Sequence, residues 1–259
     1  MRRAAFRLNQ VLKGTELTYC LFRWPALGGA DLTGQQVLNV WAYGKHLLMD
    51  LDSGYTFRSH LRMDGAWLLE AAEEGHPVAT SRAHAWTTRA VLANQNWVAL
   101  GHLLGMADLF RPAALQSELG RLGPDLMADG VDLEIAAARV LDQGERGIGA
   151  TLLDQRVIAG IGTIYMAESL FHWRVHPERP ANQVPHLPGL LAKARELLWR
   201  SVKSRTPTAT GLTIRGQTTL VHGRHRLPCR RCSTPIQVTR VGTAPRDRPA
   251  FYCPTCQPN

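Results

Sequence analysis

Cysteines, long apolar runs and, near the end of the chain, acidic residues are all scarce in this sequence. Only five of the 259 residues are cysteines, too few for the disulfide framework of a small secreted domain. No apolar run reaches the roughly 20 residues of a membrane-spanning helix. The opening Met1-Arg2-Arg3 leads into an amphipathic segment and not into a signal peptide. We therefore expect a chain without membrane contact in a reducing cytoplasm or nucleoid.

Acidic residues nearly disappear after position 200. Between Ser201 and Asn259 the sequence has ten basic residues against a single acid, Asp247. The chain as a whole carries a net charge of +9, so this segment holds all of it. Guanidinium groups pair with phosphates in a bidentate way, and such a concentration favours a nucleic-acid partner. A merely solvated basic face is the alternative.

Four of the five cysteines form two pairs in the same segment, Cys229-x-x-Cys232 and Cys253-x-x-Cys256. This spacing predicts one structural Zn²⁺ ion held by four thiolates. The segment has few large apolar residues, so metal binding would supply folding energy. Two disulfides, or four unrelated thiols, are the alternatives.

The pattern before residue 115 favours strands that follow a short helix at 2–13. A polar loop is expected at about 71–83. These features predict a β-sandwich or barrel-like domain. The expected strands are 17–24, 36–43, 46–51, 55–61, 65–69 and 89–100.

Helices are expected after Gly123-Pro124-Asp125, and the first begins with Asp132 as its N-cap. The sequence Gly160-Ile161-Gly162 stands just before another, where bare backbone N–H groups would suit a phosphate. A tight packing turn is the alternative. The overall prediction is a multidomain α+β fold. The expected helices are 132–141, 148–155, 163–171 and 187–203.

Three motifs, in order along the chain, resemble the formamidopyrimidine-DNA glycosylase/endonuclease VIII family. Residues 153–165 (LDQRVIAGIGTIY), with Glu168 and Phe171 following, resemble its helix–two-turns–helix motif. Segments 43–48 and 59–65 resemble its N-terminal β-domain, and 251–257 its terminal zinc finger. The run at 63–67, and the lack of an Asp-Pro-Arg-Arg-Phe-Gly-like segment near 100–111, favour the endonuclease VIII branch of actinobacterial type.

The resemblance implies a base-excision-repair enzyme that acts as a monomer on damaged DNA, duplex or single-stranded. Such an enzyme removes oxidised bases, in this branch pyrimidines, and nicks the strand by β/δ-elimination. The implied domains are a catalytic β-sandwich at 1–115, a helix–two-turns–helix domain at 116–225 and a zinc finger at 226–259.

The start of the chain departs from the family pattern. Members open Met-Pro-Glu-Gly, and the proline amine attacks the sugar C1′, whereas this sequence opens Met1-Arg2-Arg3-Ala4-Ala5. Two interpretations are open: the natural product begins further upstream, or this polypeptide binds lesions or abasic sites without competent chemistry. An RNA-binding zinc-ribbon protein is a third hypothesis, which leaves the Lys45 hairpin unexplained.

The resemblance also assigns residues in the β-domain. Lys45 corresponds to the hairpin lysine that contacts the phosphate at the lesion and donates a proton in β-elimination. Arg62 and Met63 correspond to the loop that enters the gap left by the flipped nucleotide. An unbranched apolar side chain such as Met63 suits a wedge between bases. A surface lysine and a core methionine are the plain alternatives.

Four further residues are carried over after residue 115. Arg121 corresponds to a DNA-contacting arginine of the endonuclease VIII branch. Gly162 and Thr163 stand at the phosphate-binding turn, where most members have asparagine in place of the threonine. Arg248 corresponds to the finger arginine that holds phosphate and assists δ-elimination, with an ordinary solvated arginine as the alternative.

Overall fold

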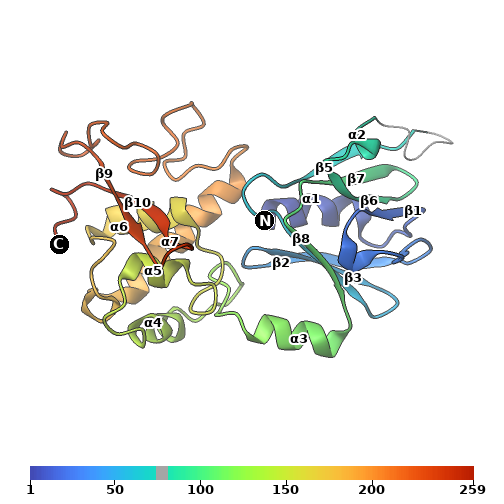
Figure 1. The fold of residues 1–259 in the computed structure, drawn as a ribbon, viewed down its shortest axis with the longest axis horizontal. Helices are drawn as coiled ribbons and strands as arrows, with labels where there is room; N and C mark the ends of the chain where they lie inside the picture. The colour runs from blue at the N-terminus through green and yellow to red at the C-terminus, as the bar shows by residue number, and fades with distance from the viewer. Residues whose placement is uncertain (74–80) are drawn as a thin grey trace. The chain divides into compact units, whose positions relative to one another are not determined.

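The computed structural model describes residues 1–73 and 81–259. The chain forms two compact units, Met1–Gly120 and Arg121–Asn259 (Figure 1). Part of the polar loop expected at 71–83 lies outside the described residues. No helix in the described ranges is long and apolar enough to cross a membrane. The finer three-domain division predicted from the sequence stays a prediction.

The first unit is a sandwich of two four-stranded antiparallel sheets, as expected. The strand orders are β1-β6-β7-β5 and β2-β3-β4-β8, and helix α1 contacts strands of both sheets (Figure 1). The elements are α1 (Arg2–Leu12), β1 (Tyr19–Phe22), η1 (Pro25–Leu27), β2 (Val37–Tyr43), β3 (His46–Leu51), β4 (Thr56–His60), β5 (Ala66–Ala71), α2 (Ser81–His84), β6 (Thr88–Ala93), β7 (Trp97–His102), β8 (Met106–Phe110) and α3 (Pro112–Gly120).

Alternation of side chains along the strands builds the core of the sandwich. Phe57 is fully buried and stacks on Phe22 with ring centroids 5.2 Å apart, while Trp67 meets its edge at 6.3 Å. The helix adds Leu8 and Leu12 from one face of α1, both fully buried. The helix expected at 2–13 therefore faces the sheets with Ala5, Leu8 and Leu12, whereas Phe6 is 62% exposed.

Two sequence expectations for this unit are wrong. The single strand expected at 89–100 is two strands, because Asn94 accepts hydrogen bonds from the N–H groups of Asn96 and Trp97 and turns the chain back. The expectation that the next helices come only after Gly123 is also wrong, because α3 already begins at Pro112. Proline is well suited to the first turn of a helix.

The second unit is built around helix α6, and its C-terminal hairpin shares the helical core. The expected helices are confirmed within one or two residues at their ends. Finger residues, among them Cys229, Ile236 and Ala250, belong to the same buried cluster as Phe171 and Leu190. The elements are α4 (Leu133–Leu141), α5 (Ile148–Leu153), α6 (Thr163–Trp173), η2 (Ala181–Gln183), α7 (Leu187–Lys203), β9 (Gln237–Val241) and β10 (Arg248–Tyr252).

The predicted N-cap of α4 generates a stability test. The Asp132 carboxylate accepts hydrogen bonds from the N–H groups of Glu134 at 2.8 Å and Ile135 at 3.1 Å. Asp132→Ala removes both and should lower the free energy of unfolding by about 1 kcal/mol. Asp132→Asn keeps an acceptor and should stay close to the wild type. Chemical denaturation measures both, and equal stability of all three proteins would show that the cap contributes nothing.

Candidate functional site

One end of the first unit's sandwich gathers the predicted β-domain residues. The strand pairs His46–His60 and His60–Met106 stand at the end of one sheet, and Ala66–His102 stands at the end of the other. Lys45 precedes β3 at this end. The short segments 61–65 and 103–105 cross here between the sheets. This end is called the loop end below.

The segment 61–65 is a fixed loop that exposes a methionine. Arg62 has a left-handed backbone (φ 51°), and its N–H donates to Nδ1 of His60 at 2.9 Å. Its aliphatic stem covers Gly105, where a Cβ would collide with it. Met63 is 90% exposed. The structure therefore places Lys45, Arg62 and Met63 at the same loop end, with Met63 projecting into solvent.

Two histidines beside Lys45 were not predicted as site residues. The rings of His46 and His60 meet edge to face with centroids 5.3 Å apart. Burial, and then the charge of Arg58, lowers the pKa of His46 to about 4. Burial, then His46 and Lys45, lowers the pKa of His60 to about 4. Both rings are therefore neutral at pH 7, next to the lysine charge.

In the second unit the two turns before α6 are held by one amide side chain. The Gln155 Nε2 donates to the carbonyls of Leu153 at 3.0 Å and Ile161 at 3.1 Å, and its Oε1 accepts the N–H of Gly160 at 3.0 Å. The sequence motif contained Gln155, but no role was predicted for it. Its contacts fix the path of the chain into α6.

The segment after Arg121 pairs with the same turns. Gly123 donates its N–H to the carbonyl of Gln155 at 2.9 Å, and a Cβ on Gly123 would collide with the backbone of Val157. Only glycine allows this close approach. Arg121 is exposed two residues earlier, so the chain brings it to the neighbourhood of the turns.

Helix α6 begins at this point with an open N-terminus. Gly162 occupies the N-cap position, where glycine has no side chain that could cap the helix, and Thr163 is the first helical residue. The first N–H groups of a helix lack intrahelical partners, and its dipole favours an anion there. The glycine N-cap before a helix matches the position expected from the Gly-Ile-Gly sequence, and phosphate binding by Gly162 and Thr163 stays a prediction.

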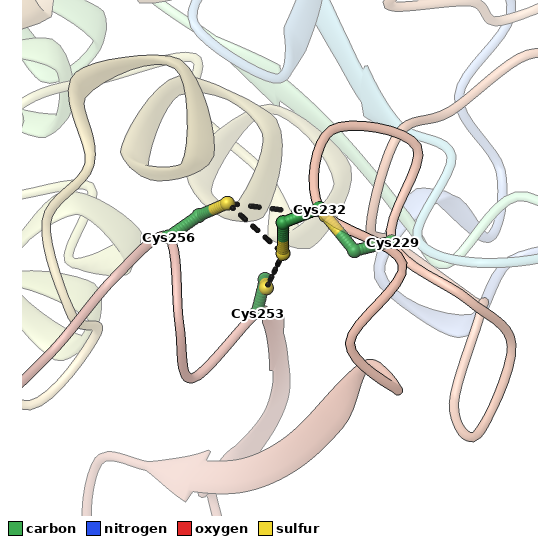
Figure 2. Close-up of side chains that lie close together, drawn as sticks. All are labelled: Cys229, Cys232, Cys253 and Cys256. Atoms are coloured by element: carbon green, nitrogen blue, oxygen red, sulfur yellow. Dashed lines mark hydrogen bonds between the residues drawn. The ribbon is translucent and has the colours of Figure 1, made fainter.

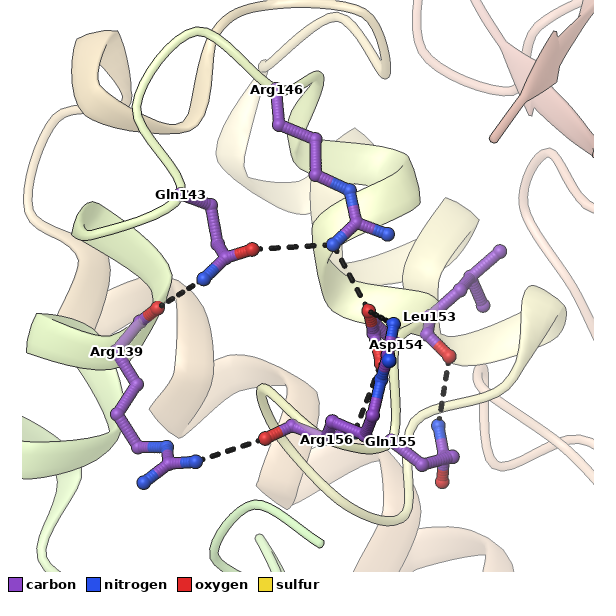
Figure 3. Close-up of polar contacts among 7 residues, drawn as sticks. All are labelled: Arg139, Gln143, Arg146, Leu153, Asp154, Gln155 and Arg156. Atoms are coloured by element: carbon purple, nitrogen blue, oxygen red, sulfur yellow. Dashed lines mark hydrogen bonds and ion pairs between the residues drawn. The ribbon is translucent and has the colours of Figure 1, made fainter. Parts of the chain in front are cut away.

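Arginines converge on one carboxylate beside the turns, as Figure 3 shows. Asp154 pairs with Arg146 at 3.0 Å and Arg156 at 3.1 Å, while Arg139 donates to the carbonyl of Arg156 at 3.0 Å. Burial alone would raise the pKa of Asp154, but hydrogen bonds from Arg156 and Arg146 lower it to about 2. The ionised carboxylate holds a basic surface in place.

Glu168, in the middle of α6, holds the segment that leads to the cysteines. Its side chain is 0% exposed and accepts hydrogen bonds from three consecutive N–H groups, of Leu220 at 2.8 Å and of Val221 and His222 at 2.9 Å. Burial raises the pKa of Glu168, and the three donors oppose that rise. A carboxylate at this position in an apolar helix was visible in the sequence, but its partners more than 50 residues away were not.

The four predicted ligands come together in space (Figure 2). All four Sγ atoms of Cys229, Cys232, Cys253 and Cys256 lie within 4.8 Å of one another, with three of the pairs at 3.4, 3.5 and 4.0 Å. Tetrahedral Zn–S bonds of about 2.3 Å require sulfur separations of about 3.8 Å. Disulfides, with S–S of about 2.05 Å, do not fit these distances. The cluster can hold a metal ion.

Two polar side chains join this cluster to α6. Arg231, between two of the cysteines, lies over the Phe171 ring at 4.2 Å and donates to the Phe171 carbonyl at 3.4 Å. Gln257 is fully buried, donates to the carbonyl of Val175 at 2.7 Å and accepts the N–H of Cys253 at 3.0 Å. The cysteine segment is therefore fixed to the C-terminal end of the helix.

Arg248 opens strand β10, which packs on α6. Its guanidinium is exposed and donates to the carbonyls of Arg246 and Asp247, each at 3.2 Å. Asp247 forms its ion pair with Arg240 and also interacts electrostatically with Arg248. The charge of Arg248 remains on the surface of the hairpin.

Comparison with known proteins identifies the family. Residues 4–100 match the formamidopyrimidine-DNA glycosylase N-terminal domain and residues 122–213 match its H2TH domain. A Streptomyces coelicolor protein named "Probable endonuclease 8 2" is 40% identical over 98% of this chain and 91% of its own length. The chain belongs to the formamidopyrimidine-DNA glycosylase/endonuclease VIII family.

Other members agree with the predicted resemblance. A Mycolicibacterium smegmatis protein named "DNA-(apurinic or apyrimidinic site) lyase Nei2" is 34% identical over 98% of this chain and 95% of its own length. The crystal structure of Lactococcus lactis Fpg with DNA containing FAPY-dG shares this family fold. It has a TM-score of 0.81 and 22% identity, and covers 99% of this chain and 98% of its own.

The histidine pair gives a pH prediction. In the unfolded chain histidine takes up a proton below about pH 6.5, whereas His46 and His60 stay neutral in the folded chain down to about pH 4. The unfolded state therefore binds more protons in that window, so stability should fall as the pH is lowered from 6.5 towards 4. Thermal unfolding at pH 7 and pH 5 measures this. His46→Phe should show a smaller fall, and an unchanged fall would contradict the assignment.

Proposed function

We propose that this chain is a DNA glycosylase with abasic-site lyase activity that acts on damaged DNA. The observation that carries the proposal is the grouping of Lys45, Arg62 and Met63 at one loop end, in a chain 40% identical to a protein named as an endonuclease 8. The relative named as a DNA-(apurinic or apyrimidinic site) lyase supports the second activity. Oxidised pyrimidines are the proposed substrates, and the bacterial cytoplasm the proposed compartment.

The proposed reaction proceeds through an imine. In the reaction that the family resemblance implies, a neutral N-terminal amine attacks C1′ of the damaged nucleotide and the base leaves with the bond electrons. The iminium that remains acidifies the C2′ proton. Loss of that proton expels the 3′-phosphate, and a second elimination expels the 5′-phosphate. Lys45 is proposed as the residue that binds the phosphate and moves a proton, and Met63 with Arg62 fills the space of the flipped nucleotide.

The second unit is proposed to hold the sugar–phosphate backbone. The open N-terminus of α6 at Gly162 and Thr163 supplies N–H donors for one phosphate. Arg121 and Arg248 supply guanidinium groups for others. Threonine offers fewer donors than the asparagine of most members, so Gly162 and its neighbours' N–H groups carry more of this contact.

We propose Zn²⁺ as the metal of the cysteine cluster. Four thiolates are a donor set typical of structural zinc, and the sulfur separations suit a tetrahedron. Four thiolates would complete the coordination of such an ion, so its role would be to fix the hairpin that carries Arg248. Phe171 on α6, and Val175 just after the helix, anchor the same segment through Arg231 and Gln257.

A trapping assay tests the lyase activity. Native protein, with its N-terminal residue sequenced first, is incubated with an abasic duplex and borohydride, which reduces an imine to a stable adduct. We expect a covalent adduct and a nicked strand. Lys45→Ala should slow nicking about 10²-fold or more, as expected for loss of a proton-transfer group. Lys13→Ala, at an exposed lysine outside the loop end, should not. Retained DNA binding without an adduct would reduce the function to lesion or abasic-site binding.

Metal analysis tests the zinc assignment. We expect one zinc per chain, and Cys253→Ala should abolish it because this buried thiol would be a ligand. DNA affinity should then fall tenfold or more, since a charge-assisted contact is worth about 1.5–3 kcal/mol. Cys20→Ala, which changes the cysteine outside the cluster, should keep metal and affinity. A wild-type protein that binds another metal, or none, would overturn the assignment.

A further inference from the structure

Trp86 is a large aromatic side chain, 77% exposed, that the family resemblance and the reaction above do not use. It lies between α2 and β6 in the first unit. Single exposed apolar residues are common on proteins and need no explanation alone. The backbone around Trp86, however, is unusually well fixed for a segment between two elements.

The guanidinium of Arg23 holds the turn that carries Trp86. Arg23 on the segment after β1 donates through Nη1 to the carbonyls of Ala83 at 2.8 Å, Thr88 at 3.1 Å and Ala85 at 3.4 Å. Within the turn, the Thr88 N–H donates to the carbonyl of Ala85 at 3.0 Å. On both sides of Trp86 in the sequence, backbone carbonyls therefore accept hydrogen bonds from the same donor, Nη1 of Arg23. The tryptophan is presented on a rigid backbone, which lowers the entropy lost when its ring is engaged.

The turn lies at the loop end, beside the Met63 loop. Thr87 accepts the N–H of Leu103 at 2.8 Å. The carbonyl of Leu103 would lie 2.9 Å from a Cβ on Gly65, so the 103 segment also touches the end of the Met63 loop. The strand pair Thr88–His102 adjoins Ala66–His102. Two exposed apolar side chains, Trp86 and Met63, therefore project from neighbouring segments.

We propose that Trp86 is a stacking surface for an unpaired nucleobase of the damaged DNA. The proposal rests on the proposed function and adds a specificity to it: preference for DNA with unstacked bases over fully paired duplex. A nucleobase offers a flat π-face of matching size, and aromatic stacking accepts any base. Removing a nucleotide from the stack, as Met63 is proposed to do, exposes such faces. The cations of Lys45 and Arg62 at the same end attract the backbone that carries them.

The test compares the affinity of two variants for three DNA probes. The probes are a fully paired duplex, an abasic duplex with a base opposite the site, and a single strand. Trp86→Ala should weaken binding of the single strand and the abasic duplex roughly 5- to 150-fold, the range for one lost aromatic–base stack. Binding of the paired duplex should not change. Trp86→Phe retains an aromatic face and should recover most of the affinity.

Trp97 is the matched control. It is 37% exposed and pairs with Ala71 at the opposite end of the same sheet, so Trp97→Ala should leave all three affinities unchanged. An equal loss on all probes would overturn the stacking assignment in favour of a general contact, and no loss would overturn it outright. Failure of the wild-type protein to bind abasic DNA would instead refute the proposed function, so the two failures are distinguishable.

Discussion

The burial of one helix, α6, is the constraint on which the second unit depends. Its N-terminus is left open at Gly162, its middle holds the 220–222 backbone through Glu168, and its last turn receives Arg231. A carboxylate with no exposure is tolerated because three N–H groups satisfy it. The cysteine segment has few large apolar residues of its own. It is stabilised because its buried residues pack into the core around Phe171. The turn at Gly162 and the four-cysteine segment are therefore both attached to the same helix.

The first unit also holds its candidate site residues in place, but it does so without a central helix like α6. Here the ends of two sheets meet, and short segments between them are locked by close approaches of the backbone. Arg62 adopts a left-handed conformation over Gly105, where only a glycine leaves room for its stem. His60 supports it by accepting its N–H, which requires the neutral ring that burial favours. Neutral histidines and a charged lysine can share this small region because the rings do not add charge.

Periodicity and capping rules predicted most elements, and motif spacing predicted the metal ligands. Asp132 was recognisable as a cap because its effect is local, and the four cysteines because two tight turns dictate their spacing. The strand break at Asn94 was missed although Asn94-Gln95-Asn96 interrupts the apolar run with three polar residues, which is a turn signal that the sequence offered. The supporting residues could not be predicted at all. Glu168 acts on residues 52 to 54 positions away, and Arg23 on carbonyls 60 to 65 positions away.

These long-range supports explain how exposed side chains can serve recognition. An exposed methionine or tryptophan on a mobile loop would lose backbone freedom on contact with DNA, at about 1–2 kcal/mol per ordered residue. In this chain His60, Arg23 and Gln155 have already fixed the loops on folding, through hydrogen bonds to backbone N–H and C=O groups. Substitution of such a support should therefore weaken binding while every DNA-facing side chain stays in place. Affinity then depends on buried residues as much as on the charges that meet the phosphates.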